Sequence, residues 1–276
     1  MRDFSGWSTA DLFAAAAAGD DEVASDAVSE VHRRGGAEEV RAALAALTDM
    51  RPAARRFGAD VLGKFGYETP LLERLFRAPS IVALVEALTV ETDQETITSI
   101  AMALCWLQAE EAVDRLLELC RHPNEYLRCD LAIMLPYFGP DHPRTVAAVE
   151  DLLLDPAPLV RDWASFAFTN ELAGADSPRL RERLLTLTTD PDRVTAAQAI
   201  HALAIRNDRR ALPALVEALT GPLDDATYSL FQAAQLLPDR SLVPGLSHML
   251  TLPDWEDTPE LIRMIVILMA PPRHPA

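Results

Sequence analysis

Three cysteines and one histidine lie close enough in the sequence to be considered first, as metal ligands. Cys120, His122 and Cys129 fall within ten residues, and Cys105 could approach them in the folded chain. Zinc sites are typically built from paired thiolates or imidazoles at short spacing, such as Cys-x2-Cys. The spacing Cys-x-His-x6-Cys does not match that pattern, so we expect cysteines that pack as small apolar residues, with no metal ion and no other cofactor. An odd set of thiols without a disulfide framework also favours a cytoplasmic protein.

The sequence lacks the motifs that mark common catalytic sites. It contains no Gly-x-Ser-x-Gly nucleophile turn, no P-loop and no Gly-x-Gly-x-x-Gly. Carboxylates are plentiful, but acid–base catalysis requires perturbed pKa values that a sequence does not reveal. The sequence therefore names no catalytic residue and favours a non-enzymatic protein.

Acidic residues outnumber basic ones throughout the chain. Asp and Glu number 42 against 25 Lys and Arg, which gives the 276 residues a formal net charge of −17. Residues 79–155 hold 14 acidic and only four basic residues. Solvated helix surfaces account for such an excess, and so does a negative field that steers a basic partner. Nucleic-acid binding is not expected, because it rests on clustered Lys and Arg, and the apolar run over 264–270 is far shorter than a membrane span of about 18 residues.

The elements that must position these side chains come from an internal repeat. Segments around Arg55, Arg128 and Arg161 share an Arg, a small or apolar residue three or four positions later and a large apolar residue seven positions later. We call this Arg position, which marks the register of each repeat, the ladder slot. Further slots follow at intervals of 31 to 35 residues, after a first interval of 42 with room for an insertion around 67–79; they hold Ile97, Ala196, Ser229 and Leu261. Second helical patterns lie between the slots and strand patterns are missing, so we predict an all-α solenoid of stacked antiparallel helix pairs.

The Asp-Pro…Val-Arg…Ala…Leu pattern, clearest over 122–138 and 155–173, resembles the HEAT-repeat family, in the bacterial form often called PBS-lyase HEAT-like repeats. The resemblance covers residues 36–270 and implies about seven units, behind an N-terminal capping helix pair over 1–35 and before a tail over 271–276. In that family an Asp and an Arg of successive repeats form a ladder between neighbours. The ladder residues here would be Arg55, Arg128, Arg161, Asp155 and Asp190, while the slots at Ile97, Ala196, Ser229 and Leu261 depart from the pattern. The family includes scaffolds, lyase-type factors and DNA glycosylases, so the resemblance identifies a fold and leaves the function open.

In HEAT-like solenoids the second helix of each unit lines the concave side. Positions one, two, five and nine residues after the ladder slot share one helical face and are expected to point into that groove. In the central units they hold aromatic side chains, acids and amides: Met102, Trp106, Asp130, Tyr137, Asp162, Trp163, Phe166, Asn170, Gln198 and His201. This mixture suits a groove that binds a peptide or side chains, although the aromatic residues could instead pack between units. The same positions of the first unit hold Arg56, Asp60 and Lys64, a more basic end.

Two classes of function follow from this reading. The first is a non-enzymatic protein-binding scaffold, an adaptor or an inhibitor, which holds a basic partner in an acidic, aromatic concave groove. The alternative is a HEAT-like enzyme or ligand carrier, of DNA glycosylase or bilin lyase type, that uses concave Trp and Asp residues. The scarcity of basic residues opposes the glycosylase. The oligomeric state is left open, and the apolar stretch 261–269 is either buried, which we favour, or an interface.

Overall fold

The computed structural model describes residues 4, 6–18, 20–64, 70–221, 226–252, 255 and 258–270, with the side chains of residues 64 and 70–74 left out of the description. Within these residues every regular element is helical and no strand occurs. The chain divides into two compact units, residues 1–138 and 139–276, and each is described by itself.

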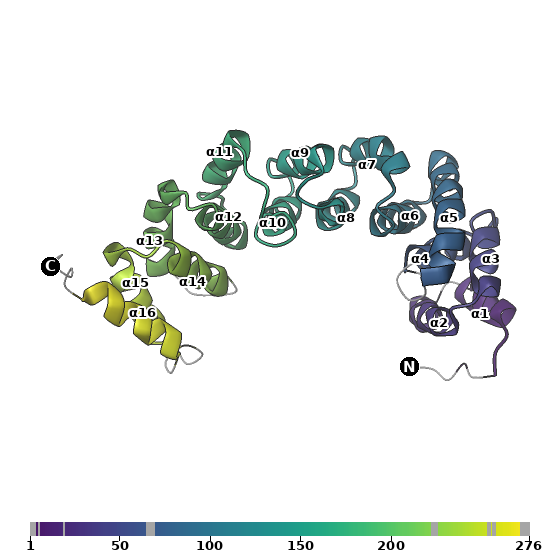
Figure 1. Cartoon of the computed structure of the whole chain (residues 1–276), viewed down its shortest axis with the longest axis horizontal. Helices are drawn as coiled ribbons and strands as arrows, with labels where there is room; N and C mark the ends of the chain where they lie inside the picture. Colours follow the sequence, from purple (N-terminus) through teal and green to yellow (C-terminus); the bar gives the residue numbers. More distant parts are fainter. Residues whose placement is uncertain are drawn as a thin grey trace. The chain divides into compact units, whose positions relative to one another are not determined.

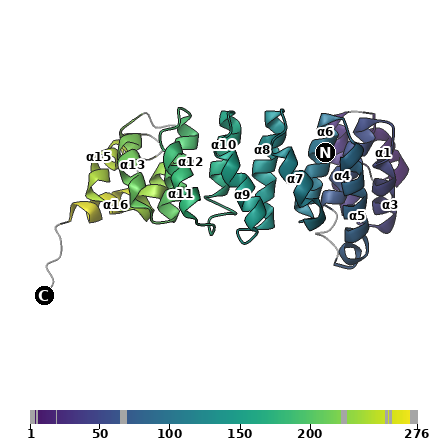
Figure 2. The same ribbon diagram turned by 90° about the horizontal axis from the view of Figure 1, so that it is seen from above.

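The first unit contains four helix pairs. Its even-numbered helices α2, α4, α6 and α8 pack side by side, and its odd-numbered helices α1, α3 and α5 form a second layer (Figures 1 and 2). The elements are α1 (Thr9–Ala16), α2 (Asp21–Arg34), α3 (Ala37–Ala46), α4 (Pro52–Lys64), α5 (Pro70–Val90), α6 (Gln94–Trp106), the 3-10 turn η2 (Glu110–Ala112), α7 (Val113–Leu119), α8 (Glu125–Met134) and the 3-10 turn η3 (Leu135–Phe138).

The second unit repeats the same two-layer arrangement. Helices α10, α12 and α14 pack against one another, and α13 packs against α15 in the other layer. The elements are α9 (Pro143–Leu152), α10 (Pro158–Ala167), α11 (Pro178–Leu187), α12 (Arg193–Ile205), η4 (Arg209–Ala211), α13 (Leu212–Thr220), α14 (Thr227–Leu236), η5 (Arg240–Leu242), α15 (Val243–Met249) and α16 (Pro259–Met269). Stacked helix pairs in two layers make the fold an α-solenoid, which confirms the predicted fold class.

Capping residues in the sequence determine where several helices begin. The side chains of Asp93 and Asp192 accept a backbone N–H in the first turns of α6 and α12, and proline occupies the first turn of α9, α10 and α11. Both devices satisfy or remove N–H groups that a helix N-terminus leaves unpaired. The long first interval is absorbed mainly by α5, whose 21 residues exceed the ten of α3 and include Pro79 in the interior.

Close helix packing in the first unit depends on small residues. Gly63 on α4 faces Ala103 on α6, where a Cβ atom at residue 63 would lie 2.8 Å from the Ala103 Cα. That space is too small for any side chain, so the glycine sets how closely α4 approaches α6.

Ladder arginines connect neighbouring helix pairs within each unit. In the second unit, Arg161 donates to both carboxylate oxygens of Asp190, at 2.8 and 2.9 Å, and to the carbonyls of Asp155 and Pro156. Arg55 makes the matching set in the first unit: it donates to Glu91 at 2.6 and 2.8 Å and to two carbonyls of the preceding turn. Each guanidinium therefore closes its own turn and holds the turn that opens the next even-numbered helix.

Arg128 occupies the same slot on α8. Its guanidinium donates to the carbonyls of His122 and Pro123, at 2.7 and 3.2 Å. This reproduces the turn-closing half of the arrangement at Arg55 and Arg161.

Candidate functional site

Aromatic and sulfur-containing side chains gather on one face of the even-numbered layer in the first unit. The rings of Trp106, at the end of α6, and Tyr137, in η3, stack with centroids 5.3 Å apart and an interplanar angle of 23°. Tyr137 is exposed, while Trp106 and Met102 are half-buried. Met102 lies one helical turn before Trp106, so both side chains share this face. We call Met102, Trp106, Asp130 and Tyr137 the first-unit face.

Asp130 supplies the charge on the first-unit face. It lies on α8 with its side chain half-buried, and burial raises the pKa of its carboxyl above the ordinary value. Among the described residues it has no hydrogen bond or ion pair of its own side chain. An unpaired carboxylate that has lost part of its hydration is stabilised when a positive charge binds next to it.

The second unit presents a related set on α10 and α12. Trp163 and Phe166 meet edge to face, with centroids 5.6 Å apart and planes at 74°. Asp162 and Trp163 are half-buried and Phe166 is exposed. Asn170 is exposed and donates to the carbonyl of Phe166 at 3.0 Å.

Asp162 has the most perturbed carboxyl of the predicted site residues. Its Oδ1 atom is buried and has no hydrogen-bond partner. Burial, followed by the negative charge of Asp192 at the start of α12, raises the pKa of Asp162 to about 6. The charged neighbour that acts on Asp162 is thus another acid.

The two remaining predicted residues lie on α12. Gln198 is half-buried, and His201 is buried with 8% of its surface exposed. Burial lowers the pKa of His201, which favours the neutral imidazole at neutral pH. His201 therefore offers a partner little surface, although it occupies the same repeat position as the exposed Phe166.

The more basic end expected in the first unit is neutralised. Arg56 on α4 forms ion pairs with Asp21 of α2 and Glu95 of α6. The side chain of Lys64 lies outside the described part of the structure.

The thiols and imidazoles do not assemble into a metal-binding group within the described residues. Cys105 and Cys129 are buried and Cys120 is half-buried, all as free thiols. Burial, with a smaller contribution from Cys120, raises the pKa of the Cys105 thiol. A buried, protonated thiol is a poor nucleophile and a poor metal ligand.

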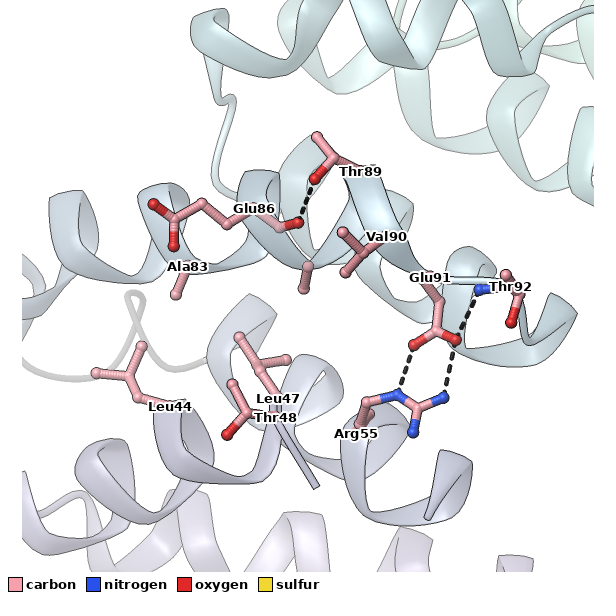
Figure 3. Close-up of a pocket in the computed structure, with 11 residues that line it drawn as sticks. Leu44, Leu47, Thr48, Arg55, Ala83, Glu86, Thr89, Val90, Glu91 and Thr92 are labelled. Carbon is pink, nitrogen blue, oxygen red and sulfur yellow. Dashed lines mark hydrogen bonds and ion pairs between the residues drawn. The ribbon is translucent and has the colours of Figure 1, made fainter. Parts of the chain in front are cut away.

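A cavity that sequence reasoning missed lies in the first unit, between α3, α4 and α5. It measures about 600 Å³, and apolar side chains such as Leu44, Leu47 and Val90 line it (Figure 3). Arg55 and Glu91 close one end through the ladder hydrogen bonds, which Figure 3 shows as dashed lines. The only sequence signal for it is the 42-residue first interval, because the lengthened α5 forms one wall.

A second cavity of about 380 Å³ occupies the matching position of the second unit, between α12, α13 and α14. Here the ladder slot holds Ala196, which lines the cavity with Arg193, Glu217 and Ala218.

The last helix is apolar on both sides. Leu261, Ile265 and Leu268 of α16 are buried, whereas Val266 and Ile267 are 63% and 65% exposed. Only one side of the 261–269 stretch is therefore covered by the described residues, and the tail over 271–276 lies outside them. No helix in the described ranges is both long and apolar enough to span a membrane.

By sequence, the chain is similar to the protein YibA of two Escherichia coli strains, K12 and O157:H7. The chain is 31% identical to the protein YibA of Escherichia coli K12 over 107 residues, which is 38% of this chain and 36% of YibA. The matched segment thus spans about a third of the relative's length. The crystal structure of YibA covers 97% of this chain at a TM-score of 0.73 and 20% identity, and 92% of that structure is matched.

Two further solved structures are similar. An engineered protein covers 94% of this chain, with 81% of its own length matched, at a TM-score of 0.55 and 18% identity. A chain of the CpcE–CpcF phycocyanin lyase complex from a Nostoc species covers 95% of this chain and is itself matched over 95%, at a TM-score of 0.45 and 17% identity. At these identities the likeness concerns the fold alone.

The assignment of the chain to a family rests on a match to a family model. The model described as HEAT repeats matches residues 81–169 and 166–235, which together exceed half of the chain. These ranges include the residues of the first-unit face, the related set on α10 and α12, and the ladder arginine Arg161. The chain belongs to the HEAT-repeat family.

Proposed function

We propose that this chain is a protein-binding scaffold that holds a basic partner on the exposed faces of its even-numbered helices. The observation that carries the proposal is the first-unit face, where the stacked pair Trp106 and Tyr137 lies on the same layer as the unpaired carboxylate of Asp130. A HEAT-repeat solenoid offers an extended surface of this kind, and HEAT repeats generally mediate protein interactions.

The chemistry of the face fits a protein partner. Aromatic side chains dominate the binding free energy of protein interfaces, because they bury a large area with little loss of conformational entropy. A stacked pair that is already in place reduces the ordering cost of association further. Met102 adds a flexible apolar contact beside the pair.

The charge of the face fits a basic partner. Asp130 and Asp162 are both partly desolvated before any partner arrives, and neither has a counter-charge in the described chain. Folding has therefore already removed part of the water from these carboxylates. A cationic side chain that binds beside them would gain electrostatic attraction with a smaller additional desolvation cost. The net charge of −10 over residues 79–155 would also accelerate encounter with a basic surface at low salt.

The test is a capture experiment with matched variants. The immobilised chain is exposed to lysate of its source organism at low and high salt, beside the double variant Asp130→Arg and Asp162→Arg. The control is the double variant Glu111→Arg and Asp141→Arg, which makes the same change of charge in the same two units. Both residues are exposed acids, and neither belongs to the first-unit face or to the related set on α10 and α12.

We expect the wild-type chain and the control to retain the same basic protein at low salt and to release it at high salt. The Asp130 and Asp162 double variant should lose that protein while its circular dichroism stays unchanged. Equal retention by both double variants would refute the proposal. A bound small molecule with no protein partner would instead support the ligand-carrier alternative.

A further inference from the structure

We propose that Asp162, Trp163 and Phe166 form a subsite in the second unit that receives one cationic side chain of the partner, a guanidinium or an ammonium group. This inference rests on the proposed function and deepens it, because it names the group that the second unit would recognise.

The first argument is the unsatisfied oxygen of Asp162. Its Oδ1 is buried and accepts no hydrogen bond from any described residue. Buried carboxylates in proteins are normally paired or hydrogen-bonded, since isolated burial is costly. Oδ1 itself is closed to a partner, but the side chain as a whole is only half-buried, so the charge of the carboxylate remains open to a cation at its exposed side.

The second argument is that the cation next to Asp162 in the sequence is committed elsewhere. Arg161 is the adjacent residue, but its Nε, Nη1 and Nη2 atoms are all committed to Asp190 and to the carbonyls of Asp155 and Pro156. The charge that acts on Asp162 from α12 is the carboxylate of Asp192. A carboxylate whose charged neighbour is another acid attracts a cation and repels an anion.

The third argument is the aromatic pair beside the carboxylate. Asp162 and Phe166 are four residues apart on α10 and so lie on one helical face. Trp163 meets Phe166 edge to face at 5.6 Å, and Phe166 is 37% exposed. An aromatic ring attracts a cation over its face within about 6 Å, which adds to the attraction of a neighbouring carboxylate.

The combination selects a cationic side chain over a metal ion. No group of three or more His, Cys, Asp or Glu that could hold a metal occurs in the described residues. A guanidinium or ammonium on an aliphatic stem can place its charge at the carboxylate while its stem contacts the rings.

The subsite can be tested without knowledge of the partner. The probes are the peptide acetyl-Gly-Arg-Gly-amide, the same peptide with citrulline in place of arginine, and the free diamine putrescine. The readout is the indole N–H signal of Trp163 in a ¹⁵N-tryptophan-labelled full chain, assigned through the Trp163→Phe variant. The tested variant is Asp162→Asn, and the control is Asp141→Asn, which removes one exposed carboxylate from the same unit.

We expect the arginine peptide to shift the Trp163 signal in the wild-type chain and in Asp141→Asn, and the citrulline peptide to leave it unchanged. In Asp162→Asn the apparent affinity for the arginine peptide should fall about tenfold, the effect of one charged hydrogen bond. An unmoved Trp163 signal, equal shifts by arginine and citrulline peptides, or unchanged affinity in Asp162→Asn would overturn the assignment. A response to putrescine without one to the peptide would overturn it as a site for a protein side chain.

Failure of this subsite and failure of the proposed function give different results. If the capture experiment succeeds but Trp163 does not respond, the scaffold stands and the subsite falls. If Trp163 responds to the arginine peptide but no basic protein is captured, the subsite stands and the scaffold function falls.

Discussion

Replacing Asp162 by Asn should stabilise the protein at neutral pH. The carboxylate of Asp162 is ionised above its pKa of about 6, in surroundings that favour the protonated form. In the unfolded chain the same group titrates near 3.8, so folding at neutral pH requires a charge to enter an unfavourable site. The amide of Asn has nearly the same shape and carries no charge, and this cost is therefore removed.

The size of the effect follows from the two pKa values. The difference between 3.8 and about 6 corresponds to about 3 kcal/mol at full burial. Because the side chain is partly exposed, solvent screening reduces the expected gain to about 1–2 kcal/mol.

The destabilisation caused by the Asp162 carboxylate depends on pH. The folded-state pKa is raised, so the folded chain binds the proton more tightly, and the destabilisation is fully present above pH 6 and absent below about pH 3.8. The gain in Asp162→Asn should therefore be large at pH 7.5 and close to zero at pH 4.

The assay is urea unfolding followed by circular dichroism at both pH values. Asp190→Asn serves as the contrasting variant. Burial raises the pKa of Asp190, but the hydrogen bonds from Arg161 and from the Asp192 backbone N–H, together with the charge of Arg161, outweigh burial and lower that pKa. Asp190→Asn should destabilise the protein at pH 7.5. A loss of stability in Asp162→Asn, or an equal gain at pH 7.5 and pH 4, would refute the reasoning.

Two further substitutions test the packing of each unit. Gly63→Val should destabilise the first unit by about 1–3 kcal/mol, because the new side chain meets the Ala103 backbone at 2.8 Å; Gly174→Ala, whose Cβ would have only ordinary contacts, is the control for thermal unfolding. Arg206→Met should destabilise the second unit by about 3–5 kcal/mol, because it removes five hydrogen bonds from a buried guanidinium to backbone carbonyls. A urea midpoint within error of wild type would show that those carbonyls find other donors.

The fold could be predicted from the sequence because its signals are local and repeated. The ladder slot, the proline and aspartate helix starts and the period of 31 to 35 residues each recur along the chain. Arg206 was missed for the opposite reason. Its guanidinium donates hydrogen bonds to carbonyls of α12 and of the segment after α10. No sequence pattern near residue 206 predicts that these carbonyls meet there.

The candidate site could be predicted only as a set of positions on a helix face. Phe166 and His201 both stand five residues after a ladder slot, yet Phe166 is 37% exposed and His201 is 8% exposed. Helical periodicity fixes the direction of a side chain, whereas burial depends on the size of its neighbours on the adjoining helices. For the same reason the unpaired state of Asp130 became visible only in the folded chain.

The adjacent residues Arg161 and Asp162 explain how the fold can keep an unpaired carboxylate. One residue of helical rotation, about 100°, separates their directions. Arg161 turns into the ladder, where it makes four hydrogen bonds to Asp190 and to the turn carbonyls. Asp162 turns to the face, and its buried oxygen has no donor among the described residues. The ladder hydrogen bonds connect α10 to the turn that opens α12. A stability cost of this kind, retained beside an aromatic pair, is typical of a binding position, and it explains why the substitution that should stabilise the protein is the one that should weaken its hold on a cation.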